Sequence, residues 1–241
     1  MDWQEKIYRY CERAGDPAFW AEPANALSNV AFLIAAFASA VAFVRAPRER
    51  RGWAEAFLIV VVAVVGFGSF LFHTYATRWA AIADTAPIAL FMLAYFTYAL
   101  IRFVGMPWWL ALPATGAFYW SLEAARGINC KVVWLAKAAA VHPGCLNGSV
   151  GYLPALGALA LIGLWLAIRR HPVWPAFLAA TLVLAASLAF RTLDYEWCEL
   201  FSVRGRHVGT HFLWHLLNAT VLNLLVRGAI RHGHGESGRA T

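Results

Sequence analysis

The chain has 241 residues, of which 61% are apolar and only 14% are charged. Soluble domains carry about 25% charged residues, so this composition excludes an ordinary soluble domain and indicates an integral membrane protein. The net charge of +7 comes from basic residues in short segments between apolar runs, and no basic stripe with interleaved aromatic residues lies outside those runs, so we expect no nucleic-acid partner.

Residues 1–23 form a polar segment of mixed charge that lacks the basic and apolar regions of a signal peptide. Seven apolar runs follow, each near the ~20 residues that a membrane helix needs. They cover roughly 24–44, 54–73, 82–101, 107–125, 150–168, 173–193 and 208–226. We therefore predict an all-α fold: a bundle of seven transmembrane helices in one domain over 24–226, with a polar tail over 227–241.

Two of the runs have internal features. The first opens with Asn25, Ser28 and Asn29, polar side chains that we expect to face other helices rather than lipid. The fourth contains Pro113 and Gly116, which favours a kink in that helix.

An odd number of spans puts the two ends of the chain on opposite sides of the membrane. The loops on the side of the C-terminus concentrate arginine in short segments at 45–51 and 169–170. Because short cytoplasmic loops are enriched in Lys and Arg, we predict a cytoplasmic C-terminus and an outside N-terminus. All cysteines fall on the other side and outside the spans, which fits disulfides in an oxidising compartment, with unpaired thiols as the alternative: Cys11, Cys130, Cys145 and Cys198.

Ionisable residues inside the spans are functional candidates, because their burial in lipid is costly. The second run ends GFGSFLFHTYATRW, in which Ser69 and His73 are four residues apart and share one helical face. The third run begins with Asp84 close to its start. The seventh begins HVGTHFLWHLLNA, in which His211 and His215 are also four apart. Span parity places all five residues toward the N-terminal side of the membrane.

Three imidazoles with an open fourth position are the ligand pattern of a catalytic zinc ion. We predict a zinc site near the N-terminal face, held by His73, His211 and His215. Asp84 would contact a water at the open position or serve as base, and Ser69 would stabilise charge on a substrate carbonyl. A single histidine in a span is more often a packing residue, so the prediction depends on the combination. The other histidines are expected outside the site: His142 and His171 in loops, His207 one turn too early, and His232 and His234 in the tail.

Three motifs resemble the alkaline ceramidase family: YCERAGDPAFWAEPANALSN at the start, GFGSFLFH followed by an aspartate, and HFLWH in the last span. That family belongs to a superfamily of seven-helix membrane hydrolases that includes the adiponectin receptors, and the resemblance covers the whole chain in order and spacing. It implies a zinc amidase that cleaves ceramide, or a similar N-acylated membrane lipid, to a free fatty acid and a sphingoid base. It assigns the zinc to the same three histidines, the water to Asp84 and a catalytic role to Ser69. The sequence carries no signal of an oligomeric state.

The resemblance also implies a calcium site in the N-terminal segment, formed by Glu12, Glu22 and the backbone carbonyl of Tyr10. The chain departs from the family pattern there, because Arg9 replaces an acidic ligand and Ala14 replaces a side-chain oxygen. Calcium takes six to eight oxygen ligands, so the site is weakened or lost. An ion pair between Arg9 and either glutamate is the alternative.

The resemblance further implies a disulfide between Cys11 and Cys198, which would tie the N-terminal segment to the loop before the last span. Cys130 and Cys145 would then pair within the long connection 126–149. In the loop that precedes the last span, two carboxylates either support the metal ligands or are solvated: Asp194 and Glu196.

Other functions stay open beside the hydrolase. A receptor or lipid-binding protein with a structural metal would need a fourth protein ligand, which Asp84 could supply. A haem protein that uses two of the histidines would explain neither Ser69 nor Asp84. A retinal protein is excluded because none of the three lysines lies in the last span: Lys6, Lys131 and Lys137.

Overall fold

The computed structural model describes residues 2–130, 135, 137, 144–203 and 205–233. Nearly all of the regular structure is helical, and η1, η2 and η5 are 3-10 turns while η3 is a π-helical turn. The elements follow one another as η1(Cys11–Arg13), α1(Pro23–Ser28), α2(Val30–Arg45), η2(Arg48–Arg50), α3(Trp53–Tyr75), α4(Arg78–Ala99), η3(Leu100–Val104), α5(Trp108–Arg126), η5(Ser149–Tyr152), α7(Leu153–Ile168), α8(Trp174–Leu193), β1(Ser202–Val203), β2(Arg206–His207) and α9(His211–His232).

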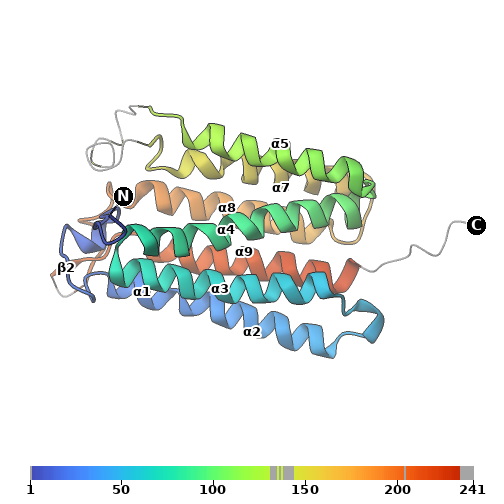
Figure 1. Ribbon diagram of the computed structural model, residues 1–241, viewed down its shortest axis with the longest axis horizontal. Helices are drawn as coiled ribbons and strands as arrows, with labels where there is room; N and C mark the ends of the chain where they lie inside the picture. Colours follow the sequence, from blue (N-terminus) through green and yellow to red (C-terminus); the bar gives the residue numbers. More distant parts are fainter. Residues whose placement is uncertain (1, 131–134, 136, 138–143, 204, 234–241) are drawn as a thin grey trace, which may run out of the picture.

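The long helices lie side by side in one bundle (Figure 1). Six helical stretches are long and apolar enough to cross a membrane: Pro23–Arg45, Trp53–Tyr75, Arg78–Val104, Ser149–Ile168, Trp174–Leu193 and His211–His232. These stretches correspond to six of the seven apolar runs. The remaining run, the fourth along the chain, forms α5. This helix has 19 residues and packs against α4 and α7, but it is less apolar than the six stretches. The all-helical membrane bundle is thus confirmed, while a seventh span stays a prediction.

α5 is one continuous helix that contains Pro113 and Gly116, so the kink there stays a prediction. Two details differ from the sequence-based expectations. The helical path of the first span is divided at Asn29, between α1 and α2. α9 continues to His232, so residues 227–232 belong to a helix rather than to a tail. The last turns of α9 stay helical because their inward face, including Ala229 and Ile230, is buried against the bundle. Residues 234–241 lie outside the described part of the chain.

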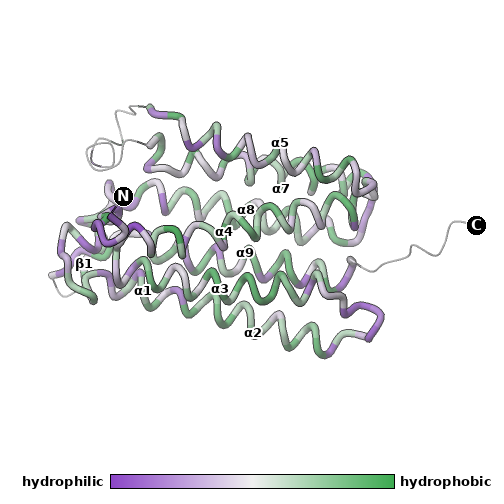
Figure 2. The backbone as a smooth tube through the Cα atoms, in the orientation of Figure 1, coloured by the Kyte–Doolittle hydropathy of each residue, from purple (hydrophilic) through white to green (hydrophobic). Residues whose placement is uncertain are grey.

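The core is built mainly from α2, α3, α4, α8 and α9. Figure 2 shows hydrophobic residues along the middle of the helices and hydrophilic residues concentrated at the ends of the bundle. Exposed tryptophans mark both ends, with Trp53 and Trp108 at one and Trp20 and Trp120 at the other. Tryptophan prefers the membrane–water interface, so these side chains suit the two edges of a bilayer.

The polar N-terminal segment covers one end of the bundle, and α9 finishes at the opposite end (Figure 1). Ile7 donates its backbone N–H to the carbonyl of Ala76, in the short turn between α3 and α4, at 2.7 Å. The backbone of Lys6 forms an isolated antiparallel β-bridge with Thr77 in the same turn. The segment therefore packs directly over the turn that joins α3 to α4.

Candidate metal centre

Three histidines meet beneath the N-terminal segment. His73 lies in the last turn of α3, and His211 and His215 occupy the first two turns of α9. All three are at most 1% exposed, and their candidate ligand atoms lie within 4.8 Å of one another. They could hold a metal ion. The prediction that these histidines from separate spans converge is therefore confirmed.

Neighbouring side chains hold two of the imidazole rings through the nitrogen that faces away from the cluster. His73 Nδ1 lies 2.5 Å from Glu22 Oε2, and His215 Nδ1 lies 2.7 Å from Ser28 Oγ. Ser28 donates its own hydroxyl hydrogen to the Asn25 carbonyl, so its oxygen is left to accept from His215. Such partners fix the tautomer and orientation of metal-binding histidines.

Two imidazole nitrogens of the cluster are buried without a hydrogen-bond partner: His73 Nε2 and His211 Nδ1. A buried nitrogen without a partner is costly, because it has lost its water and gained nothing in return. A bound cation would supply that partner to both atoms. The donor set thus fits a metal ion that prefers imidazole nitrogen, as zinc does.

Asp194 orients the beginning of α9. It is fully buried, and its carboxylate accepts the backbone N–H groups of Thr210 and His211 at 2.8 and 2.9 Å, and that of Cys11 at 2.9 Å. It therefore caps the α9 N-terminus, where N–H groups lack helical partners. Burial raises the pKa of Asp194, and the three N–H donors oppose that rise. Between the two roles left open by the sequence, the structure assigns this carboxylate the supporting one.

The chain makes room for Asp194 with Gly209. This residue has a φ of +65°, and a Cβ atom there would lie 2.3 Å from Asp194 Oδ1. Only glycine combines that backbone conformation with that close approach. Gly209 therefore keeps α9 in position to present His211 and His215.

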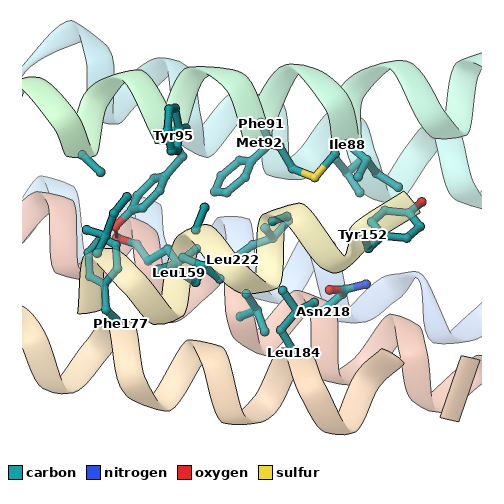
Figure 3. A pocket seen from close by; sticks show the side chains of 18 of the residues that line it. Ile88, Phe91, Met92, Tyr95, Tyr152, Leu159, Phe177, Leu184, Asn218 and Leu222 are labelled. Carbon is teal, nitrogen blue, oxygen red and sulfur yellow. Dashed lines mark hydrogen bonds between the residues drawn. The ribbon is translucent and has the colours of Figure 1, made fainter. Parts of the chain in front are cut away.

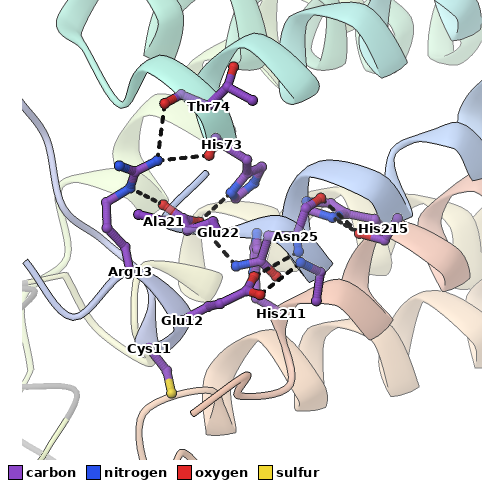
Figure 4. A network of polar contacts seen from close by, with 12 residues as sticks. Cys11, Glu12, Arg13, Ala21, Glu22, Asn25, His73, Thr74, His211 and His215 are labelled. Carbon is purple, nitrogen blue, oxygen red and sulfur yellow. Dashed lines mark hydrogen bonds and ion pairs between the residues drawn. The ribbon is translucent and has the colours of Figure 1, made fainter. Parts of the chain in front are cut away.

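A buried ion pair connects the N-terminal segment to His73 (Figure 4). Arg13 donates Nε–H to Glu22 Oε1 at 2.5 Å and an Nη2 hydrogen to the His73 carbonyl at 2.7 Å. Burial alone would raise the pKa of Glu22, but His73 and Arg13 hold it below its usual value. Glu22 thus joins a buried cation to one of the candidate ligands.

Glu12 caps α1. Its two oxygens accept the backbone N–H groups of Ala24 and Asn25 at 2.7 and 2.8 Å. Burial raises the pKa of Glu12, while these two N–H groups oppose the change. The side-chain amide of Asn25 donates to Glu22 Oε2. Both glutamates therefore contact Asn25 and lie close together, as expected. The arginine paired with Glu22 is Arg13, however, rather than Arg9, because the η1 turn directs Arg13 into the bundle.

Tyr10 contributes its ring to the site. The ring is buried and stacks on His211 with centroids 3.6 Å apart, and its centroid is 5.1 Å from that of His73. Burial raises the pKa of its hydroxyl. The sequence-based hypothesis used only the Tyr10 carbonyl and missed this ring, which covers the histidine cluster from the side of the N-terminal segment.

Asp84 and Ser69 lie at the same end of the bundle as the histidines. Asp84 is in the second turn of α4, and Ser69 is one turn before His73 in α3. The Ser69 hydroxyl lies beside the Asp84 carboxylate, whose Oδ1 is buried without a hydrogen-bond partner. Gly68 permits this proximity, because a Cβ there would lie 1.9 Å from the Ala83 carbonyl oxygen. Asp84 is not among the ligand atoms that cluster within 4.8 Å.

Arg191 is a buried cation that the sequence analysis missed. It lies near the end of α8 and donates to the Asn147 carbonyl at 2.7 Å and to Ser149 Oγ at 3.0 Å. Its guanidinium also lies 5.3 Å from the ring centroid of Tyr152 and 5.5 Å from that of Trp214. A single arginine inside an apolar run was the available signal.

The remaining histidines do not join the cluster. His207 is exposed in β2 and contacts Ser202, His171 lies between α7 and α8, and His232 ends α9. His142 and His234 lie outside the described residues.

Both expected disulfides are present. Cys11 pairs with Cys198 and Cys130 pairs with Cys145, so no described cysteine is free. The first bond joins η1 to the loop between α8 and β1, next to Asp194. The N-terminal segment and the loop before α9 are therefore fastened to each other over the histidine cluster.

An apolar cavity lies between the helices (Figure 3). Two of its lining residues border the cluster: the Phe32 ring centroid is 6.4 Å from that of His215, and Trp214 lies between His211 and His215 in α9. The cavity extends along the bundle to Tyr95 and Phe177. Its lining is almost wholly hydrophobic, with the Asn218 amide as a polar exception that Figure 3 shows.

No protein-family model matches this chain. No curated protein matches it closely enough to count as a relative. The resemblance to the alkaline ceramidase family therefore rests on the three motifs.

Proposed function

We propose that this protein is a zinc-dependent membrane hydrolase that cleaves the amide bond of ceramide or a similar N-acylated lipid. The observation that carries the proposal is the composition of the histidine cluster. Three buried imidazoles form the cluster of candidate ligand atoms, and among the described residues no carboxylate or thiolate is a member of that cluster. Structural zinc sites have four protein ligands, whereas catalytic sites have three and an open position.

His73, His211 and His215 would hold the zinc ion, which when bound lowers the pKa of water and polarises a carbonyl group. The protein side chains do the rest. Asp84 offers a buried carboxylate oxygen without a partner, which suits it to accept a proton. The hydroxyl of Ser69 lies beside that carboxylate, and we propose that it donates a hydrogen bond to the substrate carbonyl oxygen. Glu22 and Ser28 keep the imidazoles of His73 and His215 in the ligating orientation.

The lining of the cavity supports a lipid as the substrate. Ligand pockets are lined mainly by hydrophobic and aromatic side chains with a few polar groups, and this cavity follows that pattern. An acyl chain would lie among its apolar side chains, with the amide bond at the end bordered by Trp214 and Phe32. The two products would be a free fatty acid and an amine, which for ceramide is a sphingoid base.

The proposal includes seven spans, with α5 as the span that is less apolar than the others. Its exposed Trp108 and Trp120 suit the two bilayer edges. The metal centre would then face the outside or lumenal side, and the arginine-rich loops would face the cytoplasm.

For the N-terminal carboxylates we propose an ion pair in place of a calcium site. Each of the four carboxylate oxygens of Glu12 and Glu22 already accepts a hydrogen bond from a protein donor. One of these donors is the fully buried guanidinium of Arg13. The cationic partner that calcium would provide is thus a side chain of the protein.

One observation also favours a second candidate, a lipid-binding or receptor-like protein with a structural metal. The apolar cavity would bind a lipid whether or not that lipid is cleaved. The two candidates differ in whether the bound lipid is cleaved or stays intact.

The test is a lipid analysis. The purified protein is incubated with a mixed membrane-lipid extract, with and without a zinc chelator, and the products are measured by mass spectrometry. We expect fatty acid and amine to accumulate together in equal amounts, and chelator or the His73→Ala variant to abolish their release. Lipid that co-purifies intact and is never cleaved by the zinc-loaded protein would instead support the lipid-binding candidate.

A further inference from the structure

A groove lies at the end of the bundle opposite the histidines, between the last turns of α2 and α9. Four arginines line it: Arg45 from the end of α2, Arg50 from η2, and Arg227 and Arg231 from α9. They come from three separate elements. In the sequence, Arg45 and Arg50 indicate membrane topology, which does not explain why they converge with the two arginines of α9.

The four guanidinium groups gather positive charge at one place. Among the described residues, none of the ion pairs involves Arg45, Arg50, Arg227 or Arg231. Glu49 is the single acidic residue of the connection 46–52, and it does not line the groove. Arginines held together in this way bind a phosphate group well, because each offers a planar fork of N–H donors.

The rest of the groove is apolar and continues toward the middle of the membrane. Val41 and Phe37 line it one and two turns before Arg45 on α2, and Phe37 is 72% exposed. The groove therefore has a charged end at the bilayer edge and an apolar end at the depth of the lipid chains.

The spacing in α9 explains why its arginines face α2. Asn223 donates to Ser39 Oγ and to the Ala35 carbonyl, both in α2, at 2.9 and 3.1 Å. Arg227 and Arg231 follow at intervals of four residues, so they share the face of α9 that Asn223 directs at α2.

We propose that this groove is a binding site for an anionic phospholipid. The lipid phosphate lies among the four arginines, and an acyl chain runs along Phe37 and Val41. The charge of the groove selects an anionic over a zwitterionic headgroup, and its apolar end selects a lipid over free phosphate. The site is separate from the metal centre and does not depend on the hydrolase proposal.

The experiment measures lipid binding to the purified full-length protein by native mass spectrometry. Phosphatidylglycerol and phosphatidylcholine of identical acyl chains are titrated separately, and excess inorganic phosphate is added in a third series. We compare the wild type with Arg227→Gln/Arg231→Gln. The control is Arg102→Gln/Arg169→Gln, which removes the same charge from exposed positions outside the groove.

We expect one tightly bound phosphatidylglycerol, and about thirty-fold weaker binding in the groove variant, because each basic residue contributes roughly fivefold to binding of an anionic lipid. The control should bind like the wild type, and inorganic phosphate should not compete. Equal losses in both variants, equal binding of the two lipids, or displacement by phosphate would each overturn the proposal. Should the groove variant fail to fold, Arg45→Gln/Arg50→Gln is measured instead. It removes two exposed positive charges from the α2 side of the groove, and the same loss of phosphatidylglycerol binding is expected.

Discussion

Glu22 connects the N-terminal segment to the candidate metal centre through two contacts. One of its oxygens contacts the Arg13 guanidinium and the other contacts His73 Nδ1. The side chains of Arg13 and His73 are fully buried, and that of Glu22 is 3% exposed. Removing one member of such a group leaves an unpaired charge in the interior, which costs more than the pair itself contributes.

Arg13→Met should therefore weaken both folding and metal binding. We expect a loss of about 3–5 kcal/mol in unfolding free energy, typical of a broken buried ion pair. Zinc affinity should fall roughly 10- to 100-fold, because Glu22 no longer orients His73. Chelator competition and thermal unfolding measure the two effects. Arg9→Met is the matched control, since Arg9 forms no ion pair with a described residue; similar losses in both variants would contradict the assignment.

A variant of Asp84 distinguishes a catalytic metal site from a structural one. Because its carboxylate stands outside the cluster of ligand atoms, Asp84→Asn should keep most of the zinc and lose at least ~100-fold in hydrolysis, the usual contribution of a general base. His73→Ala should lose the zinc itself. Metal analysis and product release on the same preparations give the comparison. If Asp84→Asn loses zinc as completely as His73→Ala, Asp84 is a fourth ligand and the hydrolase proposal loses its main support.

At the scale of elements, the glycines of the GFGS motif set how closely α3 approaches its neighbours. A Cβ at Gly66 would meet Phe32 of α2 at 2.9 Å, and one at Gly68 would meet the Ala83 carbonyl of α4 at 1.9 Å. The two glycines therefore face different helices. Ser69 and Asp84 can lie together because α3 and α4 touch at Gly68.

Gly68→Ala should force α3 and α4 apart. The added methyl group meets backbone, which cannot rotate away, so we expect at least the ~1–3 kcal/mol destabilisation of an overpacked core. Hydrolysis should fall further than zinc content, because the histidines lie on α3 and α9 while Asp84 moves with α4. Gly116→Ala in α5 is the control: nothing lies within 4 Å of its Cβ, and alanine favours helix by about 1 kcal/mol. An active, stable Gly68→Ala protein would refute the close-approach argument.

At the scale of the whole molecule, the Cys11–Cys198 bond joins residues 187 positions apart. It holds η1 beside the loop that contains Asp194, and both segments position histidines. Cys198→Ser should leave the helical bundle intact, because the core of α2, α3, α4, α8 and α9 lies elsewhere. It should speed zinc release and expose the first 23 residues to protease.

Zinc release to a chelator and limited proteolysis check the disulfide prediction. Cys130→Ser is the comparison, since it opens the other bond, in the connection between α5 and α7. We expect it to alter zinc release less. Unchanged protease resistance in Cys198→Ser would show that the N-terminal segment holds its place without the bond.

The bundle as a whole must take one orientation in the membrane. The short arginine-rich connections and the end of α9 lie at one end, and both disulfides lie at the other. We predict that a reporter fused after Gly233 is active only in its cytoplasmic form, because short basic loops stay in the cytoplasm. Activity of a reporter that works only after export would reverse the assignment.

The sequence by itself determined the helices and the candidates for the metal site. Runs of about twenty apolar residues are a local property, and His211 and His215 share a face because they are four residues apart. Span parity then brought His73 to the same end, since a membrane limits each helix to one crossing. The pairing of Cys11 with Cys198 was available only from resemblance, because spacing does not encode which loops meet.

Only the tertiary structure decided which polar groups support the histidines. The sequence offered an ion pair of Arg9 as one alternative to calcium. Arg13 forms the pair instead, because its guanidinium also reaches the His73 and Thr74 carbonyls at the end of α3. Asp194 looked like a loop carboxylate, yet it caps α9 from sixteen positions before Thr210. These contacts join segments far apart along the chain, and their energy comes from burial that exists only after the helices have packed.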